Sequence, residues 1–137
     1  MRTPGPRVLL LLRTTLCVDA VVFLTAALLN FRMPIPLGLG ELRFPDPLWQ
    51  AGLGEAVIGV VLLAAAVTGR PAIAWVALGL SVAGIVVGLS SARVQGPARE
   101  IHLILVPLAA VVFALLLGRR RAALRLGKAT SPPGREQ

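Results

Sequence analysis

Residues 50–70, QAGLGEAVIGVVLLAAAVTGR, form an apolar stretch long enough to cross a membrane, and it carries one carboxylate, Glu55. Gly52, Ala56 and Gly59 recur around this acid at helical spacing, so they share its face of the helix. A face of small residues lets another helix pack closely, and an ionisable residue on it points into a bundle, away from lipid. The stretch therefore predicts a membrane-spanning helix with a buried acid, which the other segments must cover.

The rest of the chain repeats this apolar character. Of its 137 residues, 56% are hydrophobic and 15% are charged, in continuous runs that a soluble domain would not carry. We therefore predict an all-α fold, a polytopic membrane protein with a bundle of four transmembrane helices in one domain, residues 8–118. The predicted spans are residues 8–31, 50–68, 72–91 and 101–118. Residues 1–7 form a short lead, and residues 119–137 form a basic, partly disordered tail.

Lysine and arginine are distributed unevenly between the two sides of these spans. The side of the termini holds Arg2, Arg7, Arg13, Arg70, Arg119, Arg120, Arg121, Arg125, Lys128 and Arg135, and the opposite side holds Arg32, Arg43, Arg93 and Arg99. Cytoplasmic loops are enriched in these residues, so both termini are expected in the cytoplasm. The preference for arginine over lysine, with abundant alanine, glycine and valine, is typical of a bacterial protein, which indicates an inner-membrane location.

The longest connection, residues 32–48, contains four prolines and is expected to be non-helical. Its middle, LGLGELRF, predicts a short strand-like or interface-bound piece. The loop is too apolar for a solvated linker, so we expect it to pack over the outer mouth of the bundle.

Thr15, Asp19, Ala26 and Asn30 lie close to one face of the first span, and this polar face is expected to turn toward the bundle.

Apart from Arg13, whose side chain can extend to the cytoplasmic headgroups, the charged or imidazole side chains within the predicted spans are Asp19, Glu55 and His102. Intramembrane ionisable groups are the first candidates for function, because burying them is costly. Glu55 and His102 fall at the same depth, and a carboxylate–imidazole pair can relay protons or hold the polar head of a ligand. The alternatives are a structural hydrogen bond, a protonated Glu55 packed against glycine, or a partner among Arg93 and Arg99.

Two other patterns concern packing and lipid. Gly84 and Gly88 form a GxxxG motif, which serves either internal packing or a seam with a second copy or another membrane protein. A basic cluster follows the last span, and it predicts either contact with anionic lipid headgroups or a plain topology signal. Its members are Arg119, Arg120, Arg121 and Arg125.

Several functional classes are not favoured by the sequence. The net charge of +8 could suggest nucleic acid, but the basic residues flank apolar runs without aromatic interleaving, so no nucleic-acid partner is expected. One histidine, one cysteine (Cys17) and scattered carboxylates do not supply a metal site. No nucleotide, haem or nucleophile motif occurs, so we expect no cofactor and favour a non-catalytic role.

Short segments of the chain resemble the DoxX-like family of small four-helix membrane proteins over residues 8–118. The matching segments are Arg13 in LLRTTL, Glu55 and Gly59 in GEAVIG, and Gly69-Arg70 in TGRPA. The resemblance implies a non-catalytic accessory or assembly subunit of a membrane redox system, since some relatives serve such systems, including quinone-linked ones. Two alternatives remain: a small-molecule or proton-handling protein that uses Glu55 and His102, and an interaction protein that binds another membrane protein through the Gly84/Gly88 face.

The charge distribution leads to a testable topology. Reporter fusions placed after Gln137 should give a cytoplasmic signal, and fusions within residues 36–44 should give an external one, because the side of the termini carries most of the arginine. An external signal from the C-terminal fusion would contradict this topology.

Overall fold

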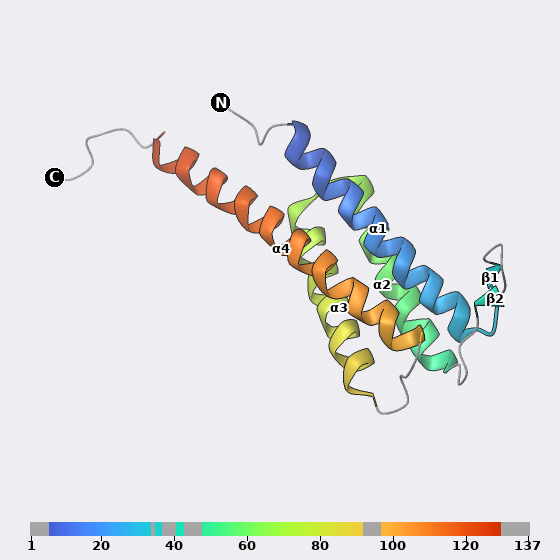
Figure 1. The fold of residues 1–137 in the computed structure, drawn as a ribbon. Coiled ribbons are helices and arrows are strands. Elements are labelled where there is room, and N and C mark those ends of the chain that lie inside the picture. The colour runs from blue at the N-terminus through green and yellow to red at the C-terminus, as the bar shows by residue number, and fades with distance from the viewer. Residues whose placement is uncertain (1–5, 34, 37–40, 43–47, 92–96, 130–137) are drawn as a thin grey trace.

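The computed structural model describes residues 6–33, 35–36, 41–42, 48–91 and 97–129 and confirms the all-α fold class (Figure 1). Its helices are α1 (Pro6–Asn30), α2 (Trp49–Thr68), α3 (Pro71–Ser90) and α4 (Pro97–Ala129). Each contains a window long and apolar enough to cross a membrane. The protein is thus a small multi-pass membrane protein built as a four-helix bundle.

The helices pack around the bundle in chain order, and α4 closes it against α1. Figure 1 shows α1 beginning and α4 ending at one end of the bundle, which we call the terminal end. The α2–α3 turn lies at this end too. We call the other end, where α1 and α3 finish, the loop end. Large apolar side chains such as Val67 and Val87 are exposed on the outside of the bundle, as lipid-facing residues are in a membrane protein.

The contact between α1 and α2 is the most extensive between any two helices, and glycines of α2 allow it. A Cβ atom added to Gly59 would lie 2.7 Å from Leu24 Cγ and 3.3 Å from the carbonyl oxygen of Ala20. One added to Gly52 would lie 3.1 Å from the carbonyl oxygen of Ala27. Only glycine leaves room for α1 at these positions.

Backbone geometry fixes where two of the helices stop. Gly69 ends α2 in the left-handed conformation (φ 63°) and donates its N–H to the Ala65 carbonyl, and Pro71 then starts α3 at its first position. At the end of α1, Arg32 adopts a similar φ of 62°. The N–H groups of Arg32 and Met33 donate to the carbonyls of Leu29 and Leu28 in a Schellman arrangement, where glycine is the usual residue.

Buried apolar side chains fill the bundle between its ends. The main cluster includes Phe23 and Leu62, which are fully buried, and a smaller cluster of Ala26 and Leu29 lies near the loop end. Trp75 of α3 packs edge-on against Phe113 of α4, with ring centroids 5.9 Å apart and planes 80° apart.

The predicted 32–48 loop is described only in part. Within the piece LGLGELRF, residues 37–44, the described part contains the short strand β2 (Glu41–Leu42). It pairs antiparallel with β1 (Ile35–Pro36), which lies just before that piece. Ile35 packs on the small cluster of Ala26 and Leu29. Residues 34, 37–40 and 43–47 lie outside the described residues, so the expected position of the loop over the bundle mouth stays a prediction.

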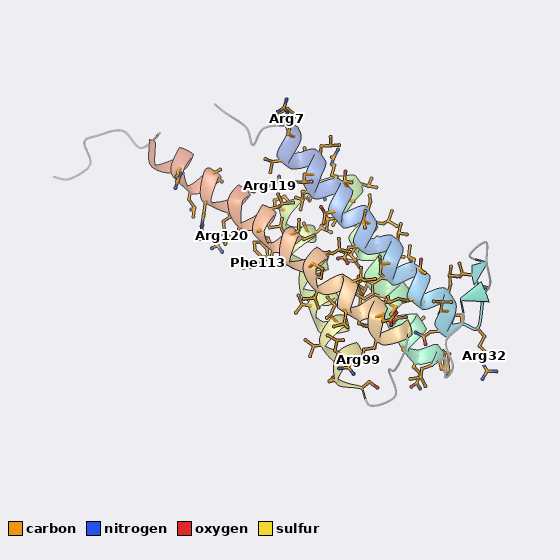
Figure 2. All side chains as sticks on the ribbon, viewed as in Figure 1. Arg7, Arg32, Arg99, Phe113, Arg119 and Arg120 are labelled. Atoms are coloured by element: carbon orange, nitrogen blue, oxygen red, sulfur yellow. The ribbon has the colours of Figure 1, made fainter. Side chains whose placement is uncertain are left out.

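The last helix differs from its predicted span, residues 101–118. It begins earlier, at Pro97, and continues through the basic segment to Ala129. The physical reason is that RRRAALRL contains good helix formers and no proline or glycine. The predicted tail is therefore helical over its first part, while residues 130–137 lie outside the described chain. Figure 2 shows Arg7, Arg119 and Arg120 toward the terminal end and Arg32 and Arg99 at the loop end.

The α1–α2 contact gives a test with a matched control. Gly59→Leu should lower the free energy of unfolding in detergent by about 1–3 kcal/mol or more, because Leu24 and the α1 backbone already occupy the space. A Cβ atom at Gly54, which is exposed on the same helix, would meet nothing within 4 Å, so Gly54→Leu should be tolerated. Equal stability of the two variants would argue against this packing.

Candidate functional site

Three helices bring polar side chains together near the loop end, around the buried carboxylate of Glu55. Asn30 Nδ2, at the end of α1, donates a hydrogen bond of 2.8 Å to Glu55 Oε2 of α2. His102 Nε2, near the start of α4, lies 3.7 Å from Glu55 Oε1. The three residues are 5–7% exposed. We call this group the loop-end cluster.

The orientation of the Asn30 amide is set from the other side. The backbone N–H of Leu48, the residue before α2, donates to Asn30 Oδ1 at 3.0 Å. Since an oxygen must accept this bond, the amide nitrogen faces Glu55. Asn30 thus ties the start of α2 to the end of α1 and offers Glu55 Oε2 a donor with a fixed position.

Gly88 of α3 makes room for the imidazole ring of His102, which faces the carboxylate oxygen that Asn30 does not contact. A Cβ atom at Gly88 would overlap the His102 ring. The glycine therefore lets His102 enter the bundle and approach Glu55. All four helices contribute to the loop-end cluster, three with polar groups and α3 with a missing side chain.

This arrangement has definite chemical capacity. Glu55 Oε2 is held by a neutral amide, while Oε1 faces an imidazole at a distance longer than a direct hydrogen bond. A small polar group or water can bond to Oε1 beside the imidazole of His102. Within the described ranges, no three His, Cys, Asp or Glu side chains gather as metal ligands.

Asp19 lies elsewhere in the bundle. It is fully buried on α1, where Ser81 Oγ of α3 donates a 3.2 Å hydrogen bond to its Oδ2 atom. Eleven residues separate Asp19 from Asn30, which corresponds to about 16 Å along a helix. The structure therefore brings Glu55 and His102 together, as their shared depth suggested, and keeps Asp19 apart from them.

The predicted packing glycines all have neighbours inside the chain. The Cβ atom missing from Gly84 would meet Ile58 and Phe23, and the one missing from Gly88 would meet His102. Gly52 and Gly59 face α1. The Gly84/Gly88 face is thus filled by residues of the same chain.

The predicted arginines lie around the ends of the bundle. Arg99 is exposed, and Arg93 lies outside the described residues. In the basic cluster, Arg119 is half-buried, and Arg120, Arg121 and Arg125 are exposed. The guanidinium of Arg13 lies at the terminal end against Gly69, where an added Cβ atom would be 3.0 Å from Nη2. A cation at this position complements the negative end of the α2 dipole.

The sequence reasoning missed two partners. The sequence alone matches neither Asn30 to Glu55 nor Ser81 to Asp19. Thr15, Asp19 and Asn30 are all buried, so the predicted polar face of α1 is confirmed. The available signal was a polar residue on one helix at a depth in the membrane similar to that of a buried acid on another helix.

Comparison with known proteins adds no relative. No family model, curated protein or solved structure matches the chain. The fold and its buried polar groups define the class, a small multi-pass membrane protein with ionisable residues inside a four-helix bundle.

The role of Gly88 can be tested through the only histidine in the chain. Gly88→Ala should displace the imidazole, so the single set of ring signals from ¹⁵N-labelled histidine should change in NMR spectra of the protein in nanodiscs. Gly79→Ala on the same helix meets nothing within 4 Å and should leave the signals unchanged. Identical spectra for the two variants would contradict the assigned contact.

Proposed function

We propose that the protein binds the polar head of a membrane-soluble small molecule at the loop-end cluster and exchanges a proton with it. The observation that carries this proposal is the buried Glu55 carboxylate, which an amide from α1 and an imidazole from α4 approach on its two oxygens. A ligand with a hydroxyl or carbonyl head can bond to the Glu55 carboxyl group beside the imidazole of His102, and its apolar body can lie among the lipid chains.

The burial of the cluster supports a dedicated site. Burying a carboxyl group in an apolar bundle costs free energy, whereas burying leucine or alanine at the same position does not. Side chains from three helices nevertheless meet at this carboxyl group, and a glycine of the fourth helix makes room for the imidazole. Structural hydrogen bonding alone needs only the Asn30 contact, whereas the imidazole adds a group that can change protonation.

The cellular setting is a further part of the proposal. The resemblance to DoxX-like proteins favours a non-catalytic accessory or assembly subunit of a membrane redox system in the bacterial inner membrane. The arginine distribution favours cytoplasmic termini, which puts the loop-end cluster near the external surface. A lipid-soluble electron carrier has the polar head and apolar body that the cluster fits. Partner binding through the Gly84/Gly88 face is not favoured, because Ile58, Phe23 and His102 occupy it.

The basic part of α4 fits the same setting. Arg120, Arg121 and Arg125 are exposed. Figure 1 shows the C-terminal part of α4 extending beyond the other helices. We propose that these residues, with Arg119, contact anionic lipid headgroups on the cytoplasmic side, each contributing about 1 kcal/mol near the surface.

Glu55→Gln tests the proposed site, because it keeps shape and hydrogen bonding but removes ionisation. We expect an apolar small molecule to copurify with the wild type, detected by mass spectrometry of organic extracts. The variant should remain folded in detergent and lose most of this molecule. It should also fail to complement a deletion strain. Glu55→Leu should in addition impair folding, because it overfills the glycine face.

Glu100→Gln is the matched control, because Glu100 is an exposed acid in the first turn of α4. It should behave as the wild type in both measurements. Full retention of the copurified molecule and full complementation by Glu55→Gln would reduce the loop-end cluster to a structural element.

A further inference from the structure

The middle of the bundle holds a second carboxyl group that the loop-end cluster does not use. Asp19 is 0% exposed. Its Oδ2 atom accepts one hydrogen bond, from Ser81 Oγ at 3.2 Å. Its Oδ1 atom is buried and has no hydrogen-bond partner among the residues that the structure describes. A buried polar atom of this kind requires a physical explanation.

The two protonation states of Asp19 make different demands on its surroundings. An ionised carboxylate would need a cation or several hydrogen-bond donors nearby. In the described part of the chain, its one hydrogen-bond donor is the neutral hydroxyl of Ser81. A protonated carboxyl fits the single donor better, but its own O–H then needs an acceptor. One internal water molecule can satisfy the remaining oxygen, because buried waters typically bridge such groups.

An apolar layer separates this position from the loop-end cluster. Phe23, one turn beyond Asp19 on α1, is fully buried. Its ring and the tip of Ile58 converge on Gly84 of α3, where a Cβ atom would lie 3.2 Å from Phe23 Cε1 and 2.7 Å from Ile58 Cδ1. Ile58 is one turn from Glu55, and Gly84 is one turn from Ser81. The layer thus lies one helical turn from each polar group.

We propose that Asp19 and Ser81 form an internal proton-binding site, in which Asp19 carries a proton and binds one water molecule. The Phe23–Ile58 layer insulates this site from the loop-end cluster. Proton exchange is then a simple transfer: a proton moves from a hydronium ion to the Asp19 carboxylate and leaves a water molecule behind. The protein contains two buried acid sites in series, which communicate only when the apolar layer opens.

Infrared spectroscopy of protein labelled with [4-¹³C]aspartate tests this proposal, because the chain has only two aspartates. The wild type in lipid should show a protonated-carboxyl band that carries the isotope shift, and the band should disappear in Asp19→Asn. It should persist in Glu55→Gln, which separates this site from the proposed function. Absence of a band that Asp19→Asn removes would overturn the proposal.

The insulating layer is tested by transferring the labelled protein into D₂O and following the band as O–H becomes O–D. Phe23→Ala should speed this exchange about tenfold or more, because the cavity it leaves admits water past the layer. Phe23→Leu, which keeps the layer filled, should exchange close to the wild-type rate. If Phe23→Ala fails to fold, Ile58→Ala removes the same layer from α2. Wild-type exchange in a folded variant with an opened layer would overturn the insulation.

Discussion

The structure depends on one constraint: a polar group inside an apolar bundle must find its partner within the protein. Lipid offers no hydrogen bonds, so Glu55 can be buried only where another helix supplies a donor. Asn30 supplies it, and Leu48 fixes the direction in which Asn30 points. This chain of two hydrogen bonds sets the end of α1 against the start of α2, and the rest of their contact follows from that register.

The glycines then determine how closely the helices approach. Dispersion between packed side chains is the main attraction between helices in lipid, and it grows as the helix axes come together. Gly52 and Gly59 bring α1 onto α2, and Gly88 admits the His102 ring. A methyl group added at Gly88 would overlap His102 of the loop-end cluster. A substitution that changes helix packing there therefore also changes the geometry of the cluster.

Much of the architecture was predictable from sequence, and the reason is physical. Apolar run length and helical spacing depend on single segments, so the four helices, the buried face of α1 and the shared depth of Glu55 and His102 could be derived without the fold. The pairing of Asn30 with Glu55 could not, because it depends on the register between two helices joined by a long loop. The position of Arg13 against Gly69 was missed for the same reason. The extent of α4 was missed because hydropathy marks where apolar residues stop, whereas a helix continues as long as its residues favour it.

The two polar contacts also specify how the helices are rotated. Helices that neighbour each other in the bundle touch mainly through apolar side chains, which form no directional bonds. The Asp19–Ser81 bond joins α1 to α3, and the Glu55–His102 contact joins α2 to α4, so each crosses the bundle between helices that are not neighbours. Rotating any one helix would turn a buried carboxyl, amide, hydroxyl or imidazole toward lipid, which is far more costly than exposing a leucine. The same side chains that offer chemistry inside the membrane therefore also select one arrangement of the four helices, at two different depths.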